Sequence, residues 1–346
     1  MISTEIKSNK YAFSTKTVNC FYKTEFSIIK EIPDLERTFF VTDEHIFSLH
    51  KEKFDGCKTI VIPAGEKNKT QQAADNVIDQ MIELGADRHS LVVGVGGGVV
   101  TDLSGYVASI YMRGIKFAFA PTTILAMVDA SIGGKNGVDV GIYKNLVGTI
   151  NQPEFLLYDF NFLKTLPEEE WRSGFAEIIK HACIHDLDMF HFLEERSLHD
   201  FMNDLEATGN LVEKNVDIKH SIVSGDEKET GARKLLNFGH TIGHAIENIH
   251  GLLHGYAISI GMVAACRISE KVNGFSPEET ERIIKLFEKY GLPVSIDFDK
   301  ERTWDILLRD KKKSGNNMDF VVLNNIGSGN VKKIPLNELK SIFNEL

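Results

Sequence analysis

Short runs of apolar residues alternate, along the first half of the chain, with stretches whose apolar positions recur every three or four residues. The short runs have strand length and are rich in β-branched and aromatic residues; they lie at 38–42, 59–62, 91–93, 116–120 and 155–158. A helix that Gly85 ends is predicted between the second and third runs, with an apolar face of Ala74, Val77, Ile78, Met81 and Ile82. This alternation predicts a mostly parallel sheet covered by helices.

The pattern changes near residue 160, and helical periodicity dominates from there to about residue 309. Helix breaks are expected near His185, Gly225, Gly251 and Gly274. A small hairpin (320–323 and 331–333) and a final helix follow, and two early runs (18–22 and 26–29) predict strand fragments before the sheet. We therefore predict an α/β domain over residues 1–160 and a mostly α-helical domain over residues 161–346.

The third strand runs directly into glycines, in the order Gly94-x-Gly96-Gly97-Gly98. The missing side chains let the backbone turn sharply and approach a bound group, and the N-terminus of the next helix favours a negative charge. A dinucleotide pyrophosphate fits such a turn. The spacing is not G-x-G-x-x-G, so a tight strand–helix turn without a ligand remains an alternative.

Histidines and acids at helical spacing form a second candidate site. His240 and His244 lie four residues apart and share a helix face, Glu247 continues that face, and His254 follows a break. Glu177 lies among apolar neighbours on another predicted helix. Two imidazoles and one carboxylate make a catalytic type of metal site with open positions. Ordinary histidines satisfied by hydrogen bonds are the alternative.

The net charge of −10 argues against a protein that binds nucleic acid or anionic membranes. Basic residues nevertheless gather beside glycines and amides, and a converging set would suit a small polyanion; the candidates are Lys135, Lys144, Lys180, Lys219, Arg233 and 311–313. Solvated surface charges are the other interpretation.

The 4 cysteines are scattered without C-x-x-C spacing, which is typical of a reduced, cytoplasmic protein. The polar N-terminal residues lack the apolar core of a signal peptide, and the longest apolar run, around 117–128, is too short to span a bilayer. We expect a cytoplasmic protein with neither membrane nor nucleic-acid partners.

Taken together, these motifs and their order along the chain resemble the 3-dehydroquinate synthase family. The resemblance extends from about Asp43 to Gly327. The resemblance is carried by Gly96 to Asp102, Tyr111-Met112-Arg113-Gly114, Pro121-Thr122-Thr123, Val128-Asp129-Ala130-Ser131, Gly133-Gly134-Lys135, Lys144-Asn145, Arg172 to Glu177, Asp226-Glu227, Leu236 to Glu247, His254-Gly255 and Asp310-Lys311-Lys312. It implies an N-terminal Rossmann-like α/β domain that binds NAD and an α-helical metal domain, usually paired as a homodimer.

The resemblance also implies roles for single residues. It makes Glu177, His240 and His254 the ligands of Zn²⁺, for which Co²⁺ can substitute, and His244 a catalytic or neighbouring group. NAD is expected to contact Asp43, Glu66, Lys69, Gly97, Gly98, Val99, Asp102, Thr122, Thr123, Lys135, Lys144, Phe162 and Thr165. The substrate is expected to contact Asp129, Lys135, Lys144, Asn145, Lys180, Lys219, Glu229, Arg233, Asn237 and Lys312 (or Lys311), with Arg113 reaching in from the partner subunit.

The implied substrate is a small anionic sugar phosphate, 3-deoxy-D-arabino-heptulosonate 7-phosphate, which carries both a phosphate and a carboxylate. The implied reaction is a closed redox cycle: oxidation of a secondary alcohol, β-elimination of phosphate, reduction, ring opening and an intramolecular aldol closure. NAD is regenerated, so there is no net oxidation.

Two residues depart from the family pattern: Asn136 stands where Thr is usual, and Tyr256 stands where Glu is usual. The sequence leaves three alternatives. Sugar phosphate cyclases that make an inosose or a valiolone have substrates without a carboxylate and need neither Lys219 nor Arg233. A metal-dependent dehydrogenase of the glycerol dehydrogenase type has no use for Lys135, Lys144 and Lys312. A degenerate, NAD-binding relative without activity need not keep the metal residues.

Overall fold

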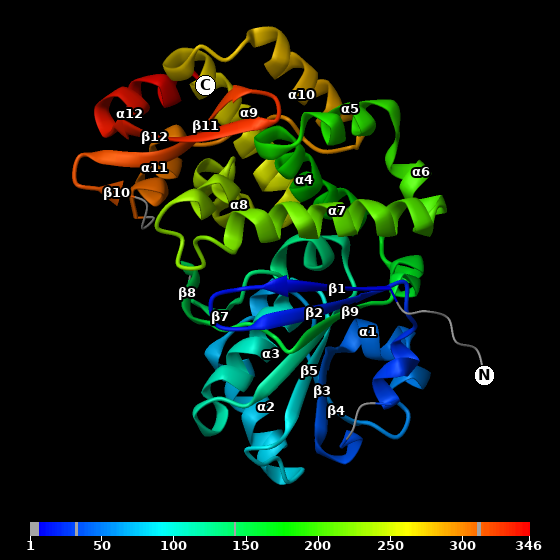
Figure 1. Ribbon diagram of the computed structural model, residues 1–346. Helices are drawn as coiled ribbons and strands as arrows, with labels where there is room; N and C mark the ends of the chain where they lie inside the picture. Colours follow the sequence, from blue (N-terminus) through cyan, green and yellow to red (C-terminus); the bar gives the residue numbers. More distant parts are fainter. Residues whose placement is uncertain (1–6, 32–33, 142, 310–312) are drawn as a thin grey trace. The chain divides into compact units, whose positions relative to one another are not determined.

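The chain divides into two compact units. The computed structural model (Figure 1) describes residues 7–31, 34–141, 143–309 and 313–346. The first unit comprises Met1–Pro167 and Leu205–Glu227, and the second comprises Glu168–Asp204 and Lys228–Leu346. The division differs from the expected boundary near residue 160, because helix α7 (Leu205–Val223) belongs with the first unit. Its Gly209 packs so closely on Phe160 that an added Cβ would lie 2.7 Å from the ring.

Within the described residues, a seven-stranded sheet forms the centre of the first unit, in the order β1-β2-β9-β6-β5-β3-β4. Strand β1 pairs antiparallel with β2, and every other neighbouring pair is parallel. The strands are β1 (Lys7–Ala12), β2 (Thr17–Tyr22), β3 (Thr38–Asp43), β4 (Lys58–Ile62), β5 (Leu91–Gly96), β6 (Lys116–Pro121) and β9 (Phe155–Tyr158). All five predicted sheet runs and the 18–22 run are confirmed as strands.

Helical segments cover both faces of this sheet. On one face a core cluster that includes Phe40, Val93 and Ala118 packs against the 3₁₀ helices η1 (Phe26–Glu31) and η3 (Lys51–Phe54) and helix α1 (Glu44–Leu49). The opposite face carries α2 (Gln71–Glu83) and α3 (Gly98–Ile110). Further short segments are η2 (Leu35–Arg37), η4 (Glu66–Asn68), η5 (Tyr111–Arg113), η6 (Ala126–Ala130) and η7 (Phe160–Thr165).

Three local predictions for this unit need correction. Residues 26–29 form a 3₁₀ helix rather than a strand, because Phe26 and Ile29, three residues apart, point together into the core. Ile82 does not share the buried face of α2, since its side chain is 58% exposed. The antiparallel ribbon of β7 (Lys135–Val140) and β8 (Tyr143–Ile150) was not predicted, because its polar and glycine-rich sequence carries little apolar alternation.

The strand order places a topological switch point between β3 and β5. From β3 the chain continues to β4 at the sheet edge, and then returns to β5 on the other side of β3. Ligands of open α/β sheets bind at the carboxyl ends of strands beside such a point. Asp43, Glu66, Gly97 and Thr122 lie at the ends of β3, β4, β5 and β6 or just after them, as predicted.

The second unit is mainly helical. Its helices are α4 (Glu168–His185), α5 (Leu187–Glu195), α6 (Leu198–Asn203), η8 (Ala232–Asn237), α8 (His240–His250), α9 (His254–Asn273), α10 (Pro277–Lys289), α11 (Lys300–Arg309) and α12 (Leu336–Glu345). The predicted C-terminal hairpin is confirmed within the sheet of β10 (Lys313–Ser314), β11 (Asn317–Asn325) and β12 (Ser328–Pro335). Gly251 and Gly274 cap α8 and α9 with φ of 63° and 69°, as expected of left-handed C-caps.

Membrane insertion through a helix finds no support in the part of the chain that the structure describes. None of the helices there combines the length and the apolarity that a bilayer crossing requires.

Candidate active site

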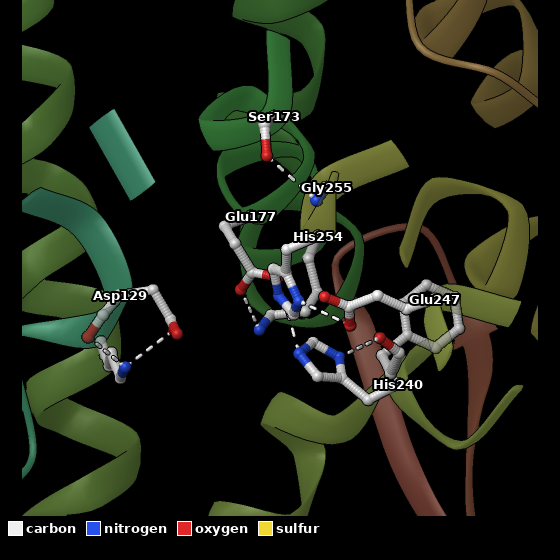
Figure 2. Close-up of polar contacts among 10 residues, drawn as sticks. Asp129, Ser173, Glu177, His240, Glu247, His254 and Gly255 are labelled. Carbon is white, nitrogen blue, oxygen red and sulfur yellow. Dashed lines mark hydrogen bonds and ion pairs between the residues drawn. The ribbon is translucent and has the colours of Figure 1, made fainter. Parts of the chain in front are cut away.

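Three residues from three helices of the second unit meet at one point (Figure 2). Glu177 lies in the middle of α4, while His240 and His254 are the first residues of α8 and α9. The Nε2 atoms of both histidines lie 3.6 Å from Oε1 of Glu177, whose side chain is fully buried. The structure thus brings together the three residues that the resemblance makes metal ligands.

A close approach of α9 to α4 places His254 beside Glu177. Gly255 donates its backbone N–H to Oγ of Ser173 over 3.0 Å, as Figure 2 shows. A Cβ on Gly255 would lie 2.0 Å from the carbonyl oxygen of Ser173, so only glycine fits there. Ser173 precedes Glu177 by one helical turn, and the contact therefore fixes the height of His254 on the face that carries the glutamate.

Each histidine is oriented through its other ring nitrogen. Nδ1 of His240 lies 3.1 Å from the carbonyl oxygen of Phe238, and Nδ1 of His254 lies 3.3 Å from Oε2 of Glu247. A protonated Nδ1 that donates to an oxygen leaves the Nε2 lone pair free to ligate, as in carboxylate–histidine–metal sites. Both Nε2 atoms face Glu177, so the set acts as one donor group.

The site attracts positive charge. Burial lowers the pKa of His254, but the hydrogen bonds and negative charges of Glu177 and Glu247 outweigh burial and raise the pKa to about 10. A cation at the same place satisfies the same carboxylates. With bonds of about 2.0–2.2 Å, tetrahedral ligands lie about 3.3–3.6 Å apart. The 3.6 Å separations match this edge, so the residues fit a zinc-like ion held by three protein ligands.

Other predicted residues lie in the same unit as this cluster, and two of them, Lys180 and His244, lie beside it. Lys180 is buried and donates to Oε2 of Glu177, and the ring centroid of His244 lies 5.1 Å from that of His240. Glu229 accepts a hydrogen bond from Nδ2 of Asn237 and has a φ of 58°, a left-handed conformation that costs a non-glycine residue energy. Arg233 is 2% exposed.

The glycine turn in the first unit fits a phosphate. A Cβ on Gly96 would lie 2.5 Å from Cγ2 of Val100, so α3 can begin this close to β5 only at a glycine. Gly97 caps α3 without a side chain, which leaves the first N–H groups of the helix available to an anion. Oγ1 of Thr122 is buried and has no hydrogen-bond partner among the described residues, although its backbone N–H binds Gly96. Both features suit a bound dinucleotide.

A buried lysine joins several residues predicted to bind NAD or substrate. Nζ of Lys69 donates to Oδ2 of Asp102 over 2.5 Å and to Oδ1 of Asn145 over 2.6 Å. Burial lowers the pKa of Lys69, but Asp102 and Glu66 outweigh burial and raise it above its ordinary value. Nζ of Lys144 lies 3.5 Å from Oε1 of Glu66. The structure therefore gathers the β4 end, α3 and β8 at one charged cluster.

The partly buried Asp129 and the buried Lys219 form a second ion pair in the first unit. Nζ of Lys219 donates to Oδ1 of Asp129 over 2.7 Å and also to its carbonyl oxygen. Asp129 lies in the π-helix η6, an irregularity that often occurs at functional sites. Lys135 is the exposed first residue of β7. Arg113 lies on an exposed turn where Met112 and Arg113 have φ of 48° and 69°.

Some of the remaining residues expected to contact NAD or the substrate lie at the starts of helices, whereas others are buried in the core or lie outside the described residues. The carboxylate of Asp43 caps α1, Oγ1 of Thr123 caps the start of η6, and Gly98 and Val99 lie in the first turn of α3. Phe162 packs in the core at 1% exposure, which leaves its main chain as the part that can reach a cofactor. Lys311 and Lys312 lie outside the described residues.

Three supporting residues were not given roles from the sequence. Glu247 orients His254; the signal was present, since it shares a helix face with His240 and His244. His50 lies 2.8 Å from Oγ1 of Thr165, and only the fold brings these residues together. Asn136, a departure from the family pattern, is buried and donates through Nδ2 to the carbonyl oxygens of Gly134 and Asn151.

The fold of this chain, a parallel sheet followed by a mainly helical unit, is similar to that of sugar phosphate cyclases. The structure is similar to that of 2-deoxy-scyllo-inosose synthase complexed with carbaglucose-6-phosphate, NAD⁺ and Co²⁺, with a TM-score of 0.85, 25% identity and coverage of 98% of this chain and 100% of the other. It is also similar to 2-epi-5-epi-valiolone synthase of Streptomyces hygroscopicus, with a TM-score of 0.86, 24% identity and coverage of 96% and 98%.

The sequence comparisons narrow this class. The model of the 3-dehydroquinate synthase N-terminal domain matches residues 59–173, and that of the C-terminal domain matches residues 174–313. A 3-dehydroquinate synthase of Leptospira interrogans is 39% identical over 318 residues, which cover 89% of this chain and 88% of the relative. One of Thermodesulfovibrio yellowstonii is 40% identical over 306 residues, covering 87% and 85%. The chain belongs to the 3-dehydroquinate synthase family.

Proposed function

We propose that the chain is an enzyme that converts 3-deoxy-D-arabino-heptulosonate 7-phosphate to 3-dehydroquinate and phosphate. The observation that carries the proposal is the cluster of Glu177, His240 and His254 with the buried Lys180 beside it, in a chain of this family. The reaction oxidises a secondary alcohol, eliminates phosphate, restores the alcohol, opens the ring and closes a carbocycle by an aldol step. When bound, NAD accepts and returns the hydride, and a zinc or cobalt ion polarises the reacting carbon–oxygen bond.

The residues of the first unit bind and orient NAD and the substrate. The first turn of α3 and the buried Oγ1 of Thr122 hold the pyrophosphate and neighbouring groups of NAD. The ion pair of Lys69 with Asp102 restricts the motion of both side chains and so keeps this part of the NAD site rigid. Lys135, Lys144 and Lys219 supply positive charge to the anionic groups and hydroxyl oxygens of the substrate.

The residues of the second unit hold the metal and bind groups of the substrate. Glu177, His240 and His254 ligate the ion, and Lys180 offsets the charge of Glu177. Arg233 presents a planar fork that matches the substrate carboxylate, and Glu229 with Asn237 binds hydroxyl groups. His244, beside His240, is placed to move a proton at a substrate oxygen.

We also propose that the enzyme acts as a homodimer in the cytoplasm. Apolar Leu146, Val147 and Ile150 are exposed on β8, as is Met112 beside Arg113. A surface of this kind favours association with another protein surface. The strained turn presents Arg113 outward, which suits a residue that completes the site of a partner subunit. Sedimentation analysis tests the dimer.

Phosphate release from the heptulosonate phosphate, measured with NAD at substoichiometric amounts, tests the function. We expect many turnovers per NAD, formation of 3-dehydroquinate, no accumulation of NADH, loss of activity with a chelator and recovery with Zn²⁺ or Co²⁺. Stoichiometric NADH would favour a dehydrogenase. Cyclisation of glucose 6-phosphate in place of the heptulosonate phosphate would favour an inosose-forming cyclase, and full activity in metal-free protein would refute the metal site.

A further inference from the structure

The Asp226-Glu227 motif has no role in the chemistry described above, yet Glu227 occupies a buried position in the first unit. Its residue is 9% exposed, and its two carboxylate oxygens accept from different elements. Oε2 accepts from Nε2 of Gln152 over 2.9 Å, and Oε1 accepts from the backbone N–H of Ser14 over 2.5 Å. One carboxylate therefore joins the β1–β2 turn to the segment that follows β8.

Gln152 in turn supports the glycine loop that precedes Lys135. Gln152 is 1% exposed, and its side-chain amide lies so close to Gly134 that a Cβ there would be 2.7 Å from Nε2. Gly134 has a φ of 71° and its carbonyl oxygen accepts from the backbone N–H of Asn151 and from Nδ2 of Asn136. The side-chain amide of Gln152 thus packs directly against this turn.

Lys135 is the next residue after this turn, and it is exposed at the start of β7. The backbone of Gly134 fixes where the Lys135 side chain begins, so a shift of Gly134 changes the positions that the ammonium group can reach without strain. A misplacement of about 1 Å in a positioning group costs about 100-fold in rate in well-ordered sites. The Gly134 backbone must therefore be held rigidly if Lys135 is to bind a phosphate.

We infer that Glu227 and Gln152 form a strut that positions the Gly133-Gly134-Lys135 loop for substrate. Glu227 is a positioning residue, because it acts through Gln152 and Gly134 and not on the substrate itself. The inference rests on the proposed function only in its assignment of Lys135 to the substrate. The strut itself is a property of the first unit and can be measured without turnover.

The pair allows an exchange of its partners as a test. In Glu227→Ala no acceptor remains at 227, so the backbone N–H of Ser14 and the side-chain amide of Gln152 both lose their partner. In Gln152→Glu two carboxylates face one another. In the double variant Gln152→Glu/Glu227→Gln, the amide at 227 accepts from Ser14 and donates to the carboxylate at 152. Each donor again faces an acceptor, and the loop should regain its support.

We expect each single variant to raise KM for the heptulosonate phosphate and to lower kcat/KM by about 10- to 100-fold, with little change in KM for NAD. The double variant should recover to within about threefold of wild type. The matched control is Glu206→Gln, since Glu206 belongs to the same unit and pairs with Lys23 through a side chain that is 79% exposed. Glu206→Gln should behave as wild type.

Hydrogen exchange of a peptide covering residues 131–137 supplies the second measurement. Exchange should accelerate in the single variants and return to the wild-type rate in the double variant, whatever the substrate of the enzyme. Lower thermal stability with unchanged exchange and unchanged kcat/KM would make the pair merely structural and would overturn the inference. Failure of the double variant to recover in either measurement would also overturn it. Absence of phosphate release in the wild type, with exchange behaving as expected, would instead refute the proposed function.

Discussion

Replacing Glu247 should weaken metal binding although Glu247 is not a predicted ligand. Its carboxylate is 6% exposed and lies 3.3 Å from Nδ1 of His254, so it fixes the ring orientation and the tautomer. Groups that orient a metal-binding histidine are worth about 10- to 100-fold in metal affinity. This range corresponds to about 1.4–2.8 kcal/mol.

The groups that each variant removes determine where its loss of metal affinity falls within this range. Glu247→Gln keeps an oxygen that can accept from Nδ1 but removes the charge, so we expect about a tenfold loss of affinity. Glu247→Ala removes both the acceptor and the charge, and we expect about a 100-fold loss. The order of affinity should be wild type, then Gln, then Ala.

Competition with a chromophoric chelator for Zn²⁺ measures these affinities directly, and the visible spectrum of the Co²⁺ form reports the ligand geometry. Glu281→Gln is the control, because Glu281 forms an ion pair with Arg267 and has a side chain that is 52% exposed. If Glu247→Ala binds zinc as tightly as wild type and folds normally, the orientation of His254 does not depend on Glu247 and the reasoning is wrong.

The site and the glycine turn support four further predictions. Glu177 and Glu247 raise the pKa of His254 from 6.5 to about 10, so zinc binding near pH 8 should release about one proton. Calorimetry in two buffers of different ionisation enthalpy measures this release. The affinity for zinc should rise with pH up to about 10. In metal-free protein the stabilisation from charged His254 should be complete below pH 6.5 and lost as the pH rises through about 10; a denaturation series without this trend contradicts the assignment. Arg233→Lys should lower kcat/KM by about one to two decades for the carboxylate-bearing substrate but little for an analogue without the carboxylate; equal losses would assign Arg233 to another role. Gly96→Ala should destabilise the fold by about 1–3 kcal/mol in a denaturant titration, since its Cβ would lie 2.5 Å from Val100, and an unchanged midpoint would refute the close packing.

Local sequence determined the sheet strands and the catalytic residue types. A strand such as 116–120 is a short run of apolar residues that any parallel sheet buries on both faces, so its position can be read without knowing its neighbours. The C-terminal ends of α8 and α9 could also be predicted from local sequence, because Gly251 and Gly274 adopt the left-handed conformation that stops a helix. The helix pair His240 and His244 followed from spacing alone.

Tertiary structure decided the features that depend on residues far apart in the chain. Helix α7 has the same periodicity as its neighbours, and only its packing assigns it to the first unit. The Phe162 side chain is aromatic like many ligand-contacting groups, but the core around Phe26 encloses it. Glu227 and Gln152 are 75 residues apart, and no local pattern foretells their hydrogen bond. Periodicity reports which face of an element is buried, whereas the identity of the residue on the other side is set by the packing of the whole chain.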